Sequence, residues 1–268
     1  MTTILRIAVQ VFKECVRDRV FYNLVLFAVL LIGVSLLLGQ MTAGQEVKII
    51  KDLGLAATSV FGLFIAIFIG IGLVSKEVER RSIYSVLAKP VTRTQLVLGK
   101  YVGLQLTLAV NVAIMTIALY GVLAFYSWTT PALAKQAWEG PALDPAILKA
   151  SYLILVELSV VTAIAVVFST YSSALLSAVF TFGLAVAGQF SADLKNFESI
   201  VDSRALVWFL RGIYYVLPNL ASFDVKLQVV HQLPVTASYL AWATMYAAVY
   251  VGALLIIAVV IFSKRDFK

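Results

Sequence analysis

Six long apolar stretches constrain the fold of this chain more than any other feature of its sequence. Each approaches or exceeds the ~20 apolar residues that a helix needs to cross the hydrocarbon core of a bilayer. Strands of a membrane barrel would alternate apolar and polar residues, and these stretches do not, so helices are predicted. Their approximate limits are Phe21–Met41, Leu55–Ser75, Val102–Trp128, Ala150–Ser169, Ser172–Ser191 and Thr236–Phe262. The predicted fold class is an all-α polytopic membrane protein with six transmembrane helices.

The basic residues orient these six helices. With the N-terminus inside, 13 of the 21 Lys and Arg residues fall on the inner side and 8 fall on the outer side. Loops on the cytoplasmic side of a membrane carry such an excess, so both termini are predicted to be cytoplasmic. Topology thus accounts for the net charge of +7, and no nucleic-acid partner is expected. A chain that is 62% hydrophobic and 13% charged is not an ordinary soluble enzyme.

Two segments are expected to lie at the membrane without crossing it. Residues 1–20 have apolar and charged positions at helical spacing, which favours a helix on the inner surface with basic residues toward lipid phosphates. A plain solvated lead-in is the alternative. In the outer segment 192–235, the apolar run Ala205–Leu217 has only 13 residues and is followed by Pro218, so it is too short to span. A re-entrant or surface-lying helix is predicted there.

The largest inner segment, residues 76–101, combines a short amphipathic helix with many charges. Ile83, Val86 and Leu87 share one helical face, and Pro90 ends the helix. The charged residues of this helix are Glu77, Glu79, Arg80, Arg81 and Lys89. A rigid, charged helix just below the bilayer is predicted, and a simple anchor on anionic lipid is the alternative.

The sequence contains no catalytic or metal-binding pattern. Gly99-Lys100 is not a nucleotide-binding P-loop, because Thr94 stands at the position of the first glycine and Tyr101 at that of the Ser or Thr. With a single histidine, His231, and a single cysteine, Cys15, no multi-histidine metal site or internal disulfide is available. We therefore expect a chain that is not itself an enzyme and that binds no metal or cofactor.

One ionisable residue, Glu157, lies within a predicted span. A carboxylate in lipid is costly, so this side chain should face protein or water, or be protonated. It can be a substrate or proton site, or it can be a structural group hydrogen-bonded to Asn111, Gln105 or Gln189. Asn111 and Gln189 carry the same two interpretations, with helix packing favoured. An autonomous secondary transporter or channel that uses Glu157 is accordingly an alternative function.

The inner segment carries a family resemblance. Glu77-x-Glu79-Arg80-Arg81-Ser82, Leu87-Ala88-Lys89-Pro90, Arg93 and Gly99-Lys100 resemble the signature of type-two ABC exporter permeases, in particular the six-span branch that includes permeases of multicopper-enzyme maturation systems. Leu217-Pro218-Asn219, with Phe223-Asp224, is similar to the stretch before the last span of that branch. The C-terminal Phe262–Phe267 is similar to its usual terminus.

The resemblance implies a single transmembrane domain over residues 1–268 that works as a dimer with separate ATPase subunits. ATP and Mg would be bound by those ATPase subunits. The second permease would be a copy or a homologue, and an extracytoplasmic accessory protein is a further candidate partner. The chain would reside in a bacterial cytoplasmic (inner) membrane. The resemblance makes residues 76–101 the coupling segment, with ATPase-coupling residues Glu77, Glu79, Arg80, Arg81, Ser82, Ile83, Leu87, Lys89, Pro90 and Arg93.

By the same resemblance, the second and fifth spans would line the pathway near the dimer axis. The outer re-entrant segment would close it through Leu217, Pro218, Asn219, Phe223 and Asp224.

Overall fold

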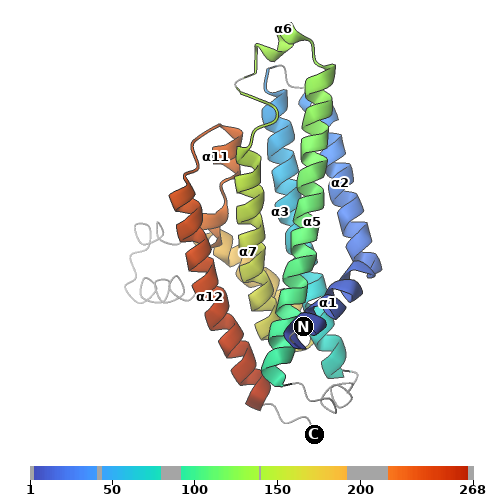
Figure 1. The fold of residues 1–268 in the computed structure, drawn as a ribbon, viewed down its shortest axis with the longest axis vertical. Helices are drawn as coiled ribbons and strands as arrows, with labels where there is room; N and C mark the ends of the chain where they lie inside the picture. The colour runs from blue at the N-terminus through green and yellow to red at the C-terminus, as the bar shows by residue number, and fades with distance from the viewer. Residues whose placement is uncertain (1–2, 41–43, 80–91, 139, 192–216, 265–268) are drawn as a thin grey trace, which may run out of the picture.

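Ten helical elements make up the part of the chain that the computed structural model describes, which is residues 3–40, 44–79, 92–138, 140–191 and 217–264, without the side chains of 72–79. No strand occurs in these ranges, and the chain is an all-helical membrane protein (Figure 1). The elements are α1 (Thr3–Val16), α2 (Arg19–Gln40), α3 (Glu46–Glu79), α5 (Arg93–Thr129), α6 (Ala132–Lys135), α7 (Ala146–Ser169), α8 (Ala174–Gln189), the 3-10 helix η2 (Leu220–Phe223), α11 (Lys226–Val230) and α12 (Ala237–Lys264).

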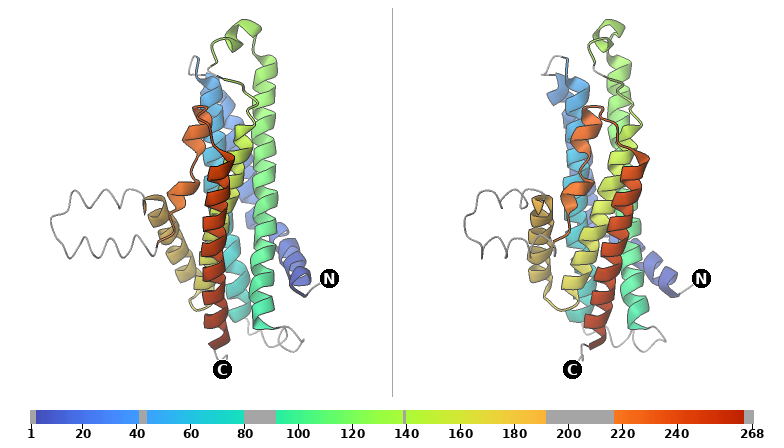
Figure 2. Two further views of the ribbon diagram at one scale, coloured as in Figure 1. Left: turned by 60° about the vertical axis from the view of Figure 1, so that its left-hand side comes forward. Right: turned by 90° about the vertical axis from the view of Figure 1, so that its left-hand side faces the viewer.

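Five of these helices, α2, α3, α5, α7 and α12, are long and apolar enough to cross a membrane. They match five of the six predicted spans. The sixth corresponds to α8, which is apolar but has only 16 residues. At 1.5 Å per residue it is about 24 Å long, less than the ~30 Å hydrocarbon core. Figure 2 shows α8 reaching only part of the way along the bundle, whereas α5 runs its full length.

The predicted limits of the second span were too narrow. Helix α3 begins at Glu46, so residues 46–54, which the sequence placed in an outer loop, extend the span by more than two turns. Their charges made this stretch look like a loop, but the structure buries Lys51 among other helices. Helix α5 likewise begins at Arg93, because Thr92 and Gln95 form a reciprocal capping box at its start.

The core of the bundle lies where α3, α5 and α7 meet. A glycine on α3 allows each close approach: a Cβ on Gly54 would lie 2.4 Å from a methyl carbon of Leu119 on α5, and one on Gly62 would lie 2.6 Å from a methyl carbon of Leu158 on α7. Helices α2 and α12 pack on the outside and expose apolar side chains such as Leu37 and Val249. Such exposed apolar faces suit contact with lipid.

Helix α1 lies across the lower part of α5, oblique to the bundle axis (Figure 1). Gly99 and Gly103 of α5 admit it, because a Cβ on Gly103 would lie 2.7 Å from both the Ala8 carbonyl oxygen and the Cβ of Val11. These two glycines, four residues apart on α5, are therefore contact points for α1. Cys15 is buried on the same face, and burial raises the pKa of its thiol to about 11.

The two ends of the bundle differ. Both termini lie toward one end, hereafter the termini end, and α6 lies at the other, the α6 end (Figure 1). Within the predicted re-entrant segment, Leu217–Val230 starts beside the end of α8 at mid-height and rises toward the α6 end (Figure 2). The chain then returns to the termini end as α12 (Figure 1).

Candidate functional site

The predicted coupling segment joins α3 directly to α5 at the termini end. Glu77 and Glu79 belong to the last turns of α3, and their side chains lie outside the description. So do Arg80, Arg81, Ser82, Ile83, Leu87, Lys89 and Pro90. Their roles therefore stay predictions.

Arg93 is the described member of this predicted set. Its guanidinium Nη1 donates hydrogen bonds to the carbonyl oxygens of Phe262, at 3.0 Å, and Ser263, at 2.7 Å. These carbonyls belong to the last turn of α12, where helix geometry leaves acceptors without intrahelical partners. Arg93 thus joins the start of α5 to the end of the last helix, a contact that sequence spacing did not indicate.

Glu157 and Gln189 form a polar pair inside the bundle at mid-height. The Nε2 atom of Gln189, at the end of α8, donates a 2.5 Å hydrogen bond to Oε1 of Glu157 on α7. The Glu157 side chain is buried, and its Oε2 has no hydrogen-bond partner within the described ranges. Gln189 was one of three partners that the sequence allowed. The hydrogen bond to Gln189 fits the structural interpretation of Glu157. The second carboxyl oxygen, Oε2, still allows the interpretation as a substrate or proton site.

Asn111 lies apart from this pair, on α5. It is fully buried, and neither Oδ1 nor Nδ2 finds a partner in the part of the chain that the structure describes. By contrast, Thr116 on the same helix donates to Ser151 Oγ of α7 at 2.9 Å. Helix α5 therefore carries one polar side chain bonded to α7 and another that is buried without a partner in the described residues.

The residues predicted to close the outer side gather around η2. Leu217, Pro218 and Phe223 are buried, and Pro218 and Leu220 fit against Gly188, where a Cβ would lie 2.8 Å from the Pro218 carbonyl oxygen. Asn219 caps η2, since its Oδ1 accepts from the Ser222 amide at 3.3 Å and from Ser191 Oγ at 3.0 Å.

Asp224 follows η2 and forms a local ion pair. Its Oδ2 lies 3.3 Å from Lys226 Nζ, and its Oδ1 accepts from the Lys226 amide at 3.1 Å. This pair is partly exposed, so its contribution to stability is at most ~1 kcal/mol. It fixes the turn between η2 and α11 and makes no bond to another helix in the described residues.

An aromatic cavity adjoins η2. Its volume is about 280 Å³, and its wall combines three aromatic residues of α12 with Asn219 of the predicted outer gate and Ser222 of η2. The lining residues are Asn219, Ser222, Tyr239, Trp242, Ala243 and Tyr246. The Asn219 amide donates to the Tyr246 hydroxyl at 3.0 Å, and the Tyr239 hydroxyl donates to the Ser222 carbonyl. The upper part of α12 is thereby tied to the predicted gate.

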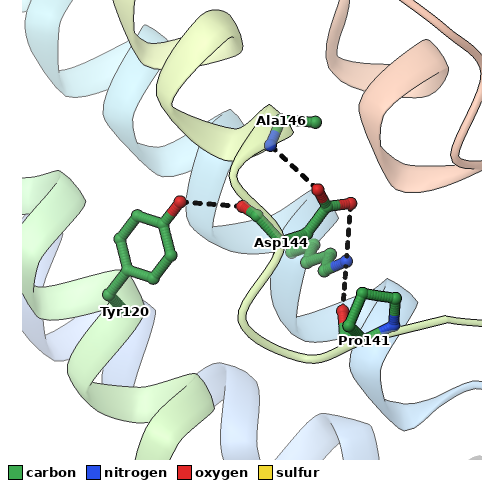
Figure 3. Close-up of polar contacts among 5 residues, drawn as sticks. Tyr120, Pro141, Asp144 and Ala146 are labelled. Carbon is green, nitrogen blue, oxygen red and sulfur yellow. Dashed lines mark hydrogen bonds and ion pairs between the residues drawn. The ribbon is translucent and has the colours of Figure 1, made fainter.

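A further buried cluster lies at the α6 end, and sequence reasoning did not find it (Figure 3). Lys51 of α3 is 1% exposed; its Nζ donates to the Pro141 carbonyl at 2.9 Å and lies 3.4 Å from Asp144 Oδ2. Asp144 also accepts from the Ala146 amide through Oδ1 at 2.8 Å, and its carbonyl accepts from the Tyr120 hydroxyl at 2.7 Å. The cluster binds α3, α5 and the start of α7 together.

A signal for this cluster was present in the sequence. Val47, Ile50, Lys51 and Leu55 recur at helical spacing, which places the lysine on an apolar face. A lysine there must find a carboxylate or carbonyl partner. None of these groups suggests a metal site, since the described residues contain no group of three or more His, Cys, Asp or Glu side chains.

These features define a polytopic α-helical membrane protein whose described polar groups tie helices together. Comparison with family models matches residues 5–267 to the family described as ABC-2 family transporter protein. The match covers nearly the whole chain, so the chain belongs to this family and is a membrane subunit of an ABC transporter. A comparison with curated proteins finds no match.

Proposed function

We propose that the chain is the permease subunit of an ATP-driven exporter, coupled to separate ATPase subunits through residues 76–101. The observation that carries this proposal is the direct continuity of that charged segment with two long helices, α3 and α5. The capping box at Thr92 makes α5 begin as a rigid helix at once. A displacement at Thr92 would therefore move a spanning helix, α5.

Two permease subunits would form the pathway. Helices α3 and α8, the predicted pathway spans, both expose apolar side chains, including Val60 and Phe68 on α3 and Leu175 and Val179 on α8. A second copy or a homologue packed near these faces would cover them. The termini end would face the cytoplasm of a bacterial inner membrane, and ATP with Mg would bind to the ATPase subunits.

The test is co-purification in mild detergent followed by an ATPase assay. The chain should carry an ATPase subunit with it and should show no hydrolysis alone. Glu79→Lys should leave membrane insertion intact but bring hydrolysis by the complex close to that of the ATPase subunit alone. Asp52→Lys is a matched control, because Asp52 is an exposed acid near the opposite end of α3. Normal coupling in Glu79→Lys would contradict the proposed coupling segment.

A second candidate function is an autonomous secondary transporter or channel that uses Glu157. Its Oε2 has no partner among the described residues, and this favours the candidate, because an intramembrane carboxyl with free hydrogen-bonding capacity can take up a proton or a cation. Such a protein would work without an ATPase subunit. Loss of the ATPase subunit should abolish transport by the permease, whereas Glu157→Gln should abolish transport by the autonomous transporter or channel.

A further inference from the structure

The last turn of α12 is held by a side chain from another helix. Its carbonyl groups at Phe262 and Ser263 both accept from the Arg93 guanidinium, at 3.0 and 2.7 Å. A cation at a helix C-terminus is favoured by the helix dipole, and hydrogen bonds from a charged donor are stronger than neutral ones. Arg93 is separated from Phe262 by 169 positions in the sequence and from Ser263 by 170. The contact is therefore a tertiary link rather than a local cap.

Arg93 is also the first residue of a rigid helix. It follows the cap residue Thr92, whose hydroxyl accepts from the Gln95 amide while the Gln95 side chain accepts from the Thr92 amide. Within the next three turns of α5, helix α1 packs closely against Gly99 and Gly103. The start of α5 therefore holds two other elements, α1 through close packing and α12 through Arg93.

The opposite end of α12 reaches the predicted outer gate. The helix has 28 residues, which corresponds to about 42 Å, and Figure 1 shows it running from the termini end well toward the α6 end. Near its start, Tyr239, Trp242 and Tyr246 line the aromatic cavity beside η2. A movement of its last turn would be carried along one continuous helix to the wall of that cavity.

We propose that Arg93 is a positioning residue that makes the end of α12 follow the start of α5, and that α12 relays this movement to the aromatic cavity at η2. The inference deepens the proposed function and rests on it for the source of the movement. It assigns Arg93 to a contact within the chain, whereas the family resemblance implies a contact with the ATPase subunit. If Arg93 has this role, its substitution should make the end of α12 more mobile relative to α5. The complex should still bind its ATPase subunit.

The first arm of the test uses the full chain alone, in lipid nanodiscs. Spin labels are placed at Val260→Cys on α12 and Leu106→Cys on α5, both exposed, in a Cys15→Ala background. The starting protein should give a single narrow distance distribution by electron–electron double resonance. Arg93→Gln should broaden it, and Arg93→Lys, which keeps the charge but not the forked donors, should fall between them. Lys264→Gln removes a neighbouring exposed cation from α12 and should change nothing. An unchanged distribution in Arg93→Gln overturns the proposal.

The second arm uses the complex with its ATPase subunit. A label pair at Val260→Cys on α12 and Leu175→Cys on α8 should shift between the nucleotide-free and the ATP–vanadate-trapped states. Arg93→Gln should lose this shift while still retaining the ATPase. Loss of ATPase binding in Arg93→Gln would make Arg93 an ATPase contact and overturn the proposal. If the unmodified chain binds no ATPase, the proposed function fails, and the first arm alone decides whether Arg93 holds α12.

Discussion

Two buried polar pairs tie α7 to its neighbours, and they differ in how fully their atoms are satisfied. At the α6 end, Lys51 and Asp144 combine opposite charges with hydrogen bonds to Pro141, Ala146 and Tyr120. At mid-height, Glu157 receives one hydrogen bond from Gln189 and keeps a second oxygen without a partner in the described residues. The first pair unites the three helices of the core, and the second joins the core to the short helix α8.

This difference indicates where the bundle can change shape. Separating α3 from α7 at the α6 end would leave a charged group buried without its partner, whereas moving α8 away from α7 would break one side-chain hydrogen bond among the described residues, that of Gln189 with Glu157. Helix α8 also contacts η2, which lines the aromatic cavity with α12. We infer that α3, α5 and α7 form the rigid part and that α8, η2 and α12 form the adjustable part.

The largest expected effect comes from breaking the Lys51–Asp144 pair. Asp144→Asn leaves the buried Lys51 ammonium without its carboxylate, and such a loss costs ~3–5 kcal/mol. Thermal unfolding in detergent, followed by tryptophan fluorescence, should show a large loss of stability. The double variant Lys51→Met with Asp144→Asn removes both charges and should be more stable than the single one. Equal destabilisation of the two would show that the buried charge is not the cause.

This cluster also marks the limit of what the sequence could predict. Five spans followed from hydropathy, because the length of an apolar run is a local property. The start of α3 at Glu46 did not, since the charges of residues 46–54 look like a loop until Lys51 is seen paired with Asp144, 93 positions away. The span predicted at Ser172–Ser191 was two residues too long at each end, because hydropathy does not locate the ends of a helix that begins at Ala174 and ends at Gln189.

The candidate site was predictable to a similar degree. Glu157 was identified because an acid within an apolar run is costly, but the choice among Gln105, Asn111 and Gln189 needed the packing of α7 against α8. Arg93 was identified only through family resemblance, and its contact with α12 depends on where two helix ends 169 positions apart meet. Side-chain partners between distant segments depend on tertiary packing, which one sequence does not reveal.

An intermediate effect is expected where α1 meets α5. Gly103→Val inserts a branched side chain at a position where its Cβ alone would lie 2.7 Å from Val11. Such overpacking costs ~1–3 kcal/mol. Displacement of α1 should expose Cys15, so alkylation with N-ethylmaleimide, measured by mass spectrometry, should become faster. Gly121→Val on the same helix is the control, because nothing lies within 4 Å of a Cβ there. Unchanged labelling in Gly103→Val would contradict the packing of α1.

The pH dependence of that labelling separates docked from undocked α1. Burial raises the pKa of Cys15 to about 11, so its reactive thiolate should increase steadily with pH up to that value while α1 is docked. In the displaced helix the pKa should return to ~8.5, and the rate should level off near there. Because the docked form binds more protons between these two values, docking should weaken as the pH rises through them. A rate that levels off near 8.5 in the unmodified chain would count against the docked arrangement.

The smallest effect on stability is expected for Glu157→Gln. Glu157→Gln preserves an oxygen that can accept from Gln189, so thermal stability should change by less than ~1 kcal/mol, whereas Glu157→Leu leaves the Gln189 amide without its acceptor and should cost ~1–3 kcal/mol. Flux of protons into liposomes, followed with an internal pH-sensitive dye and without any ATPase, tests the alternative function in the same variants. If Glu157 only joins α7 to α8, Glu157→Gln should match the unmodified chain in both measurements. A proton flux that is present in the unmodified chain and lost in Glu157→Gln would instead identify a transport site, because the two side chains differ there mainly in their ability to hold a proton.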